Sequence, residues 1–125
     1  MADLKSISTF PPVKFKKTEV KTKVRSLKKE LIQLQEKLFA QNNFSVLIIL
    51  QGMDTSGKDN AVKHIFSGVN PAGCKVKSFK VPSEEENAHH FLWRVSKECP
   101  EKRYIQVFNR SHYEDVLAVR VHRLE

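Results

Sequence analysis

The rest of the chain is arranged around residues 51–59, which read Gln51-Gly52-Met53-Asp54-Thr55-Ser56-Gly57-Lys58-Asp59. This stretch follows the apolar run 44–50 and precedes a segment whose apolar residues recur with helical spacing. The two glycines and the lysine fit the first seven positions of the pattern G-x-x-x-x-G-K-[ST], in the strand, loop and helix context that this pattern requires. The stretch therefore predicts a phosphate-binding loop at the end of a strand.

The loop pattern has a physical basis. Glycines let backbone N–H groups turn towards a phosphate, and the following helix adds its positive end. We expect phosphate contacts from Gly52, Thr55, Ser56, Gly57, Lys58 and Asp59. The eighth position normally gives a hydroxyl to Mg²⁺, but here it is Asp59, so we expect Asp54 to hold the metal instead. The alternative is an ordinary strand-to-helix turn in which Lys58 is merely solvated.

Composition narrows the function classes. The chain has 22 Lys and Arg against 14 Asp and Glu, a formal charge of +8 that attracts polyanions. It shows no recognition helix or RNA-binding sheet pattern, so we predict no specific nucleic-acid partner. Cys74 and Cys99 have neither metal spacing nor a C-x-x-C pattern. No apolar run is long enough for a bilayer or a signal peptide, so we expect a cytoplasmic protein without a membrane partner.

The part before the loop predicts a lead-in and a helix. Residues 1–17 mix prolines, serines and lysines without period, which favours a flexible segment, and residues 18–125 are expected to form one domain. Residues 18–40 predict an amphipathic helix, because apolar residues recur at steps of four and three: Val20, Val24, Leu27, Leu31, Leu34 and Leu38. A coiled coil or partner helix is the alternative use of this stripe.

Around the loop, the pattern alternates between strands and helices. The run 44–50 has too little alternation for a wet face, which favours a parallel sheet covered on both sides. The helix after the loop should stop at Gly68. Residues 73–81 predict a weaker strand, whose lysines Lys75, Lys77 and Lys80 form either a polyanion path or a solvated edge.

The next segment begins with a capping box, in which Ser83 is the N-cap and Glu86 the third position. We expect one helix from there to about Cys99. Arg94 lies off its apolar stripe, where it could reach a nucleotide phosphate or form a surface salt bridge.

A third strand at 104–108 ends in the polar cluster 109–115. Ligands of open α/β sheets gather at the carboxyl ends of strands, so we expect Arg110 and Glu114 to converge with Asp54 and Lys58. Two cations and two carboxylates suit phosphoryl transfer, which depends on positioning and charge neutralisation. Glu114 also has capping-box spacing from Ser111, which is its structural alternative.

Four segments together resemble the second family of polyphosphate kinases. They are Gly52-Met53-Asp54-Thr55-Ser56-Gly57-Lys58-Asp59, Phe79-Lys80-Val81-Pro82-Ser83, Phe91-Leu92-Trp93-Arg94 and Phe108-Asn109-Arg110-Ser111-His112-Tyr113-Glu114-Asp115-Val116-Leu117. The resemblance runs from about residue 18 to the end. It implies a three-layer, thymidylate-kinase-like P-loop fold with a parallel sheet, and an enzyme that transfers phosphoryl groups between inorganic polyphosphate and AMP or ADP. ATP is then the product or the reverse substrate.

The resemblance also implies roles for single residues. Asp54 would serve Mg²⁺-linked catalysis (Mn²⁺ being the substitute), Gly57 and Lys58 phosphate contact, Arg110 charge stabilisation, and Glu114 a metal or nucleotide-side contact. Asn109, Arg94 and Lys80 are assigned to the nucleotide and polyphosphate side.

The form Asn-Arg-Ser-His-Tyr-Glu at residues 109–114 is similar to the subgroup that phosphorylates AMP and ADP, whereas other members carry Asp in place of Asn109. The sequence departs from the family pattern at His90, where an Asp is expected. Family members also continue past the position of Glu125, so we expect a truncated catalytic core that lacks later strands and lid helices and has little turnover. Two other functions stay open: an ATP-dependent small-molecule kinase, and a non-catalytic polyanion-binding module. A homo-oligomer is compatible with all three.

Overall fold

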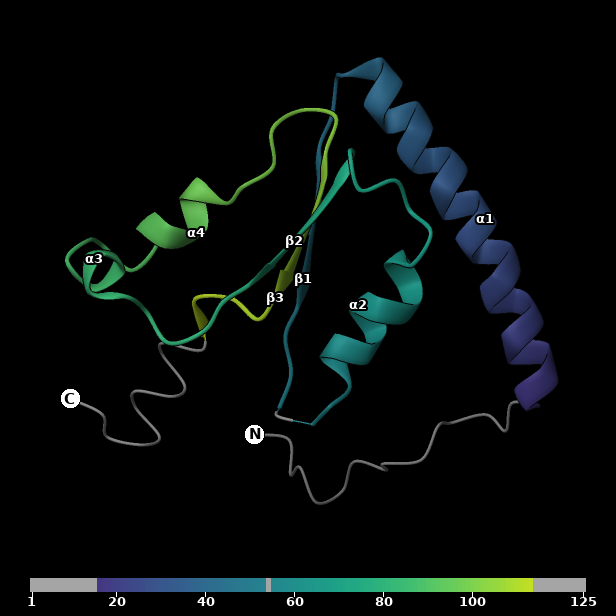
Figure 1. Ribbon diagram of the computed structural model, residues 1–125, viewed down its shortest axis with the longest axis horizontal. Coiled ribbons are helices and arrows are strands. Elements are labelled where there is room, and N and C mark those ends of the chain that lie inside the picture. Colours follow the sequence, from purple (N-terminus) through teal and green to yellow (C-terminus); the bar gives the residue numbers. More distant parts are fainter. Residues whose placement is uncertain (1–15, 54, 114–125) are drawn as a thin grey trace, which may run out of the picture.

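The computed structural model describes residues 16–53 and 55–113 (Figure 1). Its elements follow the chain in this order: α1 (Lys17–Gln41), β1 (Val46–Leu50), α2 (Lys58–Phe66), β2 (Cys74–Ser78), α3 (Glu84–Asn87), α4 (Trp93–Lys97) and β3 (Ile105–Asn109). All three predicted strands and the two helices that flank β1 are confirmed. The lead-in predicted for residues 1–17 lies almost wholly outside the described residues.

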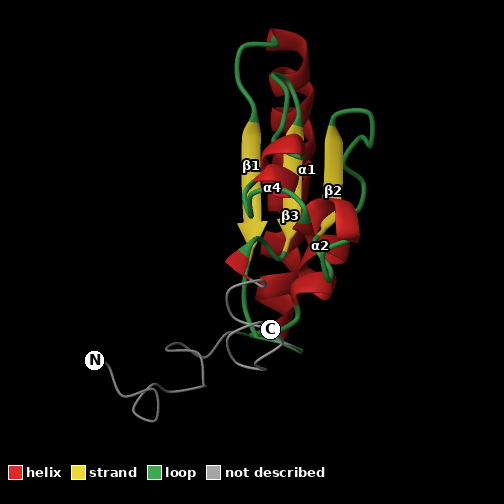
Figure 2. Cartoon of the chain, turned by 90° about the vertical axis from the view of Figure 1, so that its left-hand side faces the viewer, coloured by secondary structure: helices red, strands yellow, loops and turns green. Residues whose placement is uncertain are grey.

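The strands form one parallel sheet in the order β1-β3-β2. Figures 1 and 2 show helices on both sides of it, with α1 and α2 on one face and α3 and α4 on the other. The predicted α/β architecture of helix, sheet and helix layers is therefore present. Because the strands are parallel, their carboxyl ends lie at one edge, and this edge carries the loop after β1.

The centre of the sheet is β3, whose five residues are all buried. Phe108 packs edge-to-face against Phe79, with ring centroids 4.9 Å apart. Val107 and Ile105, which are 0% and 4% exposed, complete the apolar core of the strand. Burial on both faces fixes the register of β3 against its two neighbours, since a slip would expose these side chains.

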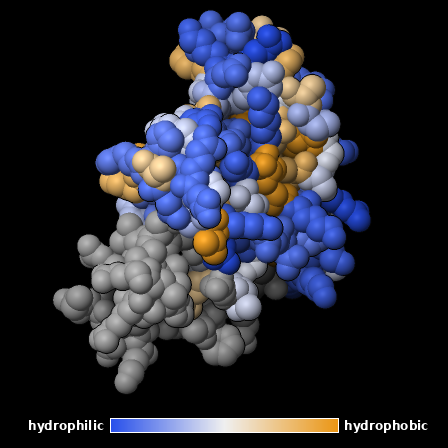
Figure 3. Space-filling view, turned by 60° about the vertical axis from the view of Figure 1, so that its left-hand side comes forward, coloured by the Kyte–Doolittle hydropathy of each residue, from blue (hydrophilic) through white to orange (hydrophobic). Residues whose placement is uncertain are grey.

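The edge strand β1 differs from its prediction. The sequence favours a strand covered on both faces, yet Val46, Leu47 and Ile49 are 40%, 39% and 49% exposed. Within the described residues β1 pairs with β3 alone, which leaves its other edge and part of its faces uncovered. Figure 3 shows apolar surface reaching solvent between hydrophilic regions on the face that it displays.

Helix α1 forms as predicted but packs through only part of its apolar stripe. Its buried residue is Gln35, and Phe39 stacks edge-to-face with Tyr104 at 5.9 Å and lies under the guanidinium of Arg103 at 3.8 Å. Most of the apolar stripe stays exposed instead: Val20 39%, Val24 43%, Leu27 48% and Leu34 61%. Leu31 and Leu38 are half-buried, so only part of the stripe lies in the packing face, and use of the exposed part by a partner helix stays open. Among the described helices, none is long and apolar enough to cross a membrane.

The single helix predicted from Ser83 to about Cys99 is wrong, because the segment forms two short helices, α3 and α4. The capping box of Ser83 and Glu86 is present and starts α3. The break follows at once, where the ring of His89 contacts the carbonyl of Glu85 and the ring of His90 accepts from the N–H of Leu92. Such local side-chain bonds compete with helix continuation.

The close approach of α1 to the residue before β2 yields a test. A Cβ at Gly73 would overlap the side-chain amide of Gln35, which is 1% exposed, and would come to 3.0 Å from the ring of Phe39. We expect Gly73→Ala to lower the free energy of unfolding by about 2 kcal/mol, the scale of overpacking. Urea unfolding measures it. Adding Gln35→Ala removes the overlapping amide, so a double variant without partial recovery would contradict this cause.

Candidate phosphate site

The loop between β1 and α2 has the backbone that a phosphate-binding loop requires. Gly57 has φ 90° and is the N-cap of α2, and Thr55 has φ 64°. These left-handed conformations favour glycine at position 57 and strain position 55. At Gly52 a Cβ would lie 2.9 Å from the hydroxyl of Ser56, so the close approach there also requires glycine. The predicted loop conformation is thus present.

Lys58 begins α2 and turns back over the loop. Its Nζ donates to the carbonyls of Gly52 and Met53, both at 2.6 Å, and to the hydroxyl of Ser56 at 3.3 Å. The ammonium is therefore held inside the loop by neutral acceptors. An incoming phosphate offers charged acceptors, and charge-assisted hydrogen bonds are about twice as strong as neutral ones.

Arg110 reaches the same place from the end of β3. The strands β1 and β3 pair in register with Leu50 opposite Asn109, and the N–H of Arg110 donates to the carbonyl of Leu50 at 3.0 Å. Arg110 itself has φ 73°, a left-handed conformation that costs about 1–2 kcal/mol for a side-chain-bearing residue. Backbone strain of this kind clusters at functional sites.

Together these elements enclose a cavity of about 250 Å³. Its lining comes from the loop, the first turn of α2 and the end of β3: Thr55, Ser56, Gly57, Lys58, Asp59, Asn60 and Arg110. The predicted convergence of Lys58 and Arg110 is therefore confirmed. The volume is below the roughly 300–1,000 Å³ of pockets for whole small molecules, so the cavity suits a phosphate group rather than a complete nucleotide.

Two side-chain contacts join the end of β3 to neighbouring segments, one to the first turn of α2 and one to the residue after β1. The side-chain amide of Asn109 donates to the carboxylate of Asp59, and the hydroxyl of Ser111 donates to the side-chain oxygen of Gln51 at 3.0 Å. Sequence reasoning did not anticipate either pair, nor the place of Asn60 in the lining. Adjacency of the first and third strands was predicted, so the unusual Asp59 and Asn109 could have been recognised as partners.

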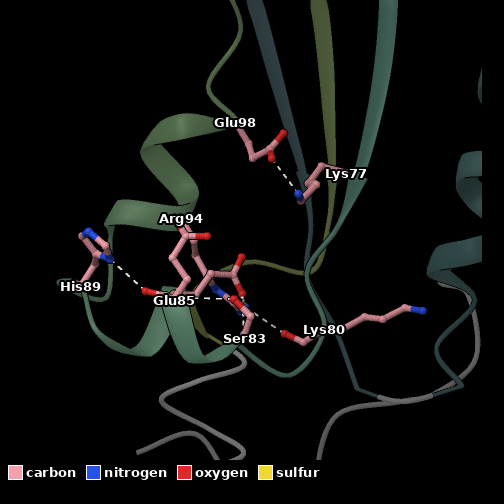
Figure 4. A network of polar contacts seen from close by, with 8 residues as sticks. Lys77, Lys80, Ser83, Glu85, His89, Arg94 and Glu98 are labelled. Atoms are coloured by element: carbon pink, nitrogen blue, oxygen red, sulfur yellow. Dashed lines mark hydrogen bonds and ion pairs between the residues drawn. The ribbon is translucent and has the colours of Figure 1, made fainter.

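Arg94 and Lys80 lie elsewhere. The cavity lining does not include either residue. Arg94 is 5% exposed, and its guanidinium donates to the main-chain carbonyl of Lys80 at 3.0 Å and contacts the carboxylate of Glu86 at 3.3 Å (Figure 4). It also lies over the ring of Phe79, 5.3 Å from the centroid. Arg94 is thus neither exposed nor a surface ion pair, and it fastens α3 and α4 to the chain after β2.

Lys77 and Glu98 add a second contact between β2 and the end of α4. Their side chains meet at 2.6 Å and are 38% and 35% exposed (Figure 4). An ion pair of this exposure contributes little to stability. Lys75 lies over the ring of Tyr104 at 4.4 Å, so two of the three lysines on and after β2 have structural partners. The polyanion path along β2 remains a prediction.

The metal site predicted from the sequence cannot be built from the described residues. Asp54 and Glu114 both lie outside them, and the rest of the described chain holds no group of three or more His, Cys, Asp or Glu side chains placed for a metal ion. Among the described lining residues Asp59 is the one acid. Mg²⁺ commonly uses one or two carboxylates together with substrate phosphates and waters, so a lone carboxylate beside a phosphate cavity fits its chemistry.

Larger hollows of about 530 and 370 Å³ lie along the first turns of α1. Both are lined by residues of that helix alone, between Thr18 and Ser26. Among the described residues no second element brings polar groups to them, whereas the smaller cavity collects groups from the loop, the first turn of α2 and the end of β3. The smaller cavity is therefore the candidate site.

The sequence profile of Polyphosphate kinase 2 (PPK2) matches residues 14–125. The chain belongs to the polyphosphate kinase 2 family. It is 52% identical over 99 residues to an ADP-polyphosphate phosphotransferase of Rhodopseudomonas palustris and 51% identical over 98 residues to an AMP/ADP-polyphosphate phosphotransferase of Meiothermus ruber. The crystal structure of polyphosphate kinase 2 from Arthrobacter aurescens TC1 superposes with a TM-score of 0.87 at 38% identity.

The matched segments are parts of longer proteins. The alignments cover 79% and 78% of this chain but 34% and 37% of the Rhodopseudomonas and Meiothermus relatives, about a third of their length. The superposition with the Arthrobacter structure covers 99% of this chain and 46% of that one. The resemblance inferred from the sequence is thus confirmed, together with the incomplete P-loop fold.

The capping box offers a pH test. The backbone N–H of Ser83 donates to Glu86 at 2.9 Å, and this bond, aided by Arg94 and opposed by desolvation, lowers the pKa of Glu86. A lowered carboxyl pKa stabilises the fold above the ordinary value of about 4.3, and this stabilisation is lost as pH falls through the folded-state pKa. We expect Glu86→Gln to remove this part of the acid dependence of unfolding. Glu85→Gln is the matched control, and equal effects of the two variants would contradict the assignment.

Substitutions at Arg110 can change the stability of the fold and the affinity for phosphate independently. Because glycine tolerates φ 73°, we expect Arg110→Gly to be about 1 kcal/mol more stable than Arg110→Ala. Both variants remove the cation and should bind tripolyphosphate several-fold more weakly than the unmodified chain. Chemical denaturation and calorimetric titration measure the two effects. Equal stability of the alanine and glycine variants would show that the backbone relaxes in solution.

Proposed function

We propose that this chain forms the phosphate-binding part of an enzyme that transfers a phosphoryl group between inorganic polyphosphate and AMP or ADP. The observation that carries the proposal is the convergence of Lys58 and Arg110 on one small cavity at the ends of β1 and β3. The printed activities of the Rhodopseudomonas and Meiothermus relatives supply the substrates, which are polyphosphate with ADP and with AMP or ADP.

In the forward direction, an oxygen of the nucleotide's terminal phosphate attacks the terminal phosphorus of polyphosphate. The bond from that phosphorus to the bridging oxygen breaks, and the polyphosphate leaves one unit shorter with the electron pair. Lys58 and the loop N–H groups hold the donor phosphates, while Arg110 offsets the charge of the transferred group. Running the same step backwards makes the product nucleotide the donor, which is ATP where ADP was the acceptor and ADP where AMP was.

The divalent ion that the family implies, Mg²⁺ or Mn²⁺, would neutralise phosphate charge during transfer. We propose Asp54 and Glu114 as its protein ligands, as the resemblance implies. The proposed cytoplasmic setting agrees with two free thiols, Cys74 and Cys99. Burial raises the pKa of the Cys74 thiol, which keeps it protonated.

The nucleoside must bind outside the described cavity, which accommodates only phosphate. Five of its seven lining residues are exposed, so a phosphate held by the described residues alone stays in contact with water. Water at the transferred group weakens electrostatic stabilisation and permits hydrolysis. We therefore expect the 125-residue chain, assayed alone, to turn over more slowly than the longer relatives.

Charge-matched lysine variants test the function. We expect Lys58→Ala to weaken tripolyphosphate binding at least tenfold and to abolish phosphorylation of AMP or ADP, because it removes the cation inside the loop. Lys63→Ala removes the same charge from an exposed position on α2 and should change binding less than twofold. Calorimetry measures affinity, and nucleotide chromatography after incubation with polyphosphate and Mg²⁺ measures transfer.

The outcomes separate the three functions. Equal, small losses for both variants would identify a diffuse polyanion-binding module and overturn the proposal. Transfer that uses ATP but never polyphosphate, towards a small-molecule acceptor, would identify the alternative kinase.

A further inference from the structure

Two positions of the site hold unusual residues for a phosphate-binding loop. The eighth loop position, which usually gives a Ser or Thr hydroxyl to Mg²⁺, is Asp59. In P-loop nucleotide hydrolases an Asp on a neighbouring strand completes the metal site, and here the end of β3 carries neutral Asn109. The acid therefore stands in the loop and the neutral side chain at the end of the strand, the reverse of the usual arrangement.

The structure joins these two residues directly. The side-chain amide of Asn109 donates to Oδ1 of Asp59, across 50 residues of sequence. Asn109 is 9% exposed, and among the described residues its own Oδ1 is buried without a hydrogen-bond partner. Burying an amide oxygen without a hydrogen bond costs free energy. Hydrogen bonding within the pair therefore does not by itself explain why Asn109 stands at this position.

The place of Asp59 becomes electrostatically unfavourable when a phosphate binds beside it, unless a divalent cation lies between the two anions. Its residue lines the same cavity as Lys58 and Arg110, where the phosphate is proposed to bind. An acid in the first turn of α2 is favourable for the helix, but a carboxylate beside a bound phosphate repels it. A divalent cation between the two anions reverses the sign of this interaction, because each anion then contacts a positive charge.

We infer that Asp59 supplies a carboxylate contact to the divalent ion that accompanies the phosphates, and that Asn109 is the positioning residue that holds this carboxylate at the cavity. The inference rests on the proposed function and adds a residue to its metal site. Asn109 is thereby assigned to orienting Asp59 rather than to contacting nucleotide or polyphosphate.

Two opposite effects of one substitution distinguish this role from a structural one. The full 125-residue chain is titrated with Mn²⁺ in the presence of saturating tripolyphosphate, with the free ion followed by electron paramagnetic resonance. Asp59→Asn should weaken Mn²⁺ binding at least tenfold. In EDTA, the same variant should bind tripolyphosphate as tightly as the unmodified chain or more tightly, because a negative charge has left the cavity. Loss of a merely structural contact would weaken both.

The positioning role of Asn109 needs its own variants. Asn109→Ala leaves the carboxylate but removes its donor, and should weaken Mn²⁺ binding by about tenfold, the scale of outer-shell partners of metal ligands. Asp59→Ser combined with Asn109→Asp returns the hydroxyl and the strand-end acid to their usual positions. This double variant should recover most of the Mn²⁺ affinity that Asp59→Asn loses.

Glu19→Gln is the matched control, since Glu19 is also an acid in the first turn of its helix and lies outside the cavity lining. Equal Mn²⁺ affinity of the Asp59→Asn and Glu19→Gln variants overturns the inference. The inference is also overturned if the unmodified chain binds tripolyphosphate but no Mn²⁺. Failure of the unmodified chain to bind tripolyphosphate at all overturns the proposed function, and the inference with it. Circular dichroism melting curves show whether each variant is folded.

Discussion

Parallel pairing of β1 with β3 is the constraint on which the site depends. The register sets Leu50 beside Asn109, so the residues that follow each strand start from neighbouring points on one edge. The loop after β1 and Arg110 after β3 are separated by about half the chain, yet the ladder brings them to one cavity. The buried β3 makes this alignment hard to shift, because any slip would move its apolar residues out of the core. Packing in the middle of the sheet therefore fixes the relative positions of the cavity residues at its edge.

The backbone and side chains around the cavity are held in place by contacts within the protein. Thr55 and Arg110 are both held in left-handed conformations, and both line the cavity. Lys58 is held by loop carbonyls, which keep its ammonium at the place where a phosphate would enter. Folding stabilises these strained conformations, so less reorganisation is needed when phosphate binds. Stability and function are thus in partial conflict at Arg110, as expected for a strained functional residue.

The elements that the sequence predicted correctly are those with strong local patterns. The apolar run of β1, the glycine loop and the capping box at Ser83 each have a short-range physical cause, and each is present. Predictions that depended on tertiary contacts were less successful. Helix α1 exists, but its apolar stripe does not identify its buried face, because the close approach of Gly73 brings Gln35 inwards instead.

The same division holds for the site. Convergence of Lys58 and Arg110 followed from topology and is confirmed. Arg94 was placed near phosphate because a lone arginine is an ambiguous residue, and only the three-dimensional position of Glu86 and the Lys80 carbonyl shows where it is held. The Asp59 and Asn109 pair was accessible to sequence reasoning, although each residue had been considered separately. Asp54 and Glu114 remain predictions.

The exposed stripe on α1 has a consequence for how the protein behaves at high concentration. Valines and leucines that reach solvent along one helix can join two molecules, while the lysines around them, such as Lys21 and Lys23, keep equally charged molecules apart. Salt screens the repulsion but not the apolar attraction. Colloidal stability of the chain is therefore governed by ionic strength, and dilute buffers favour dispersed molecules over clusters.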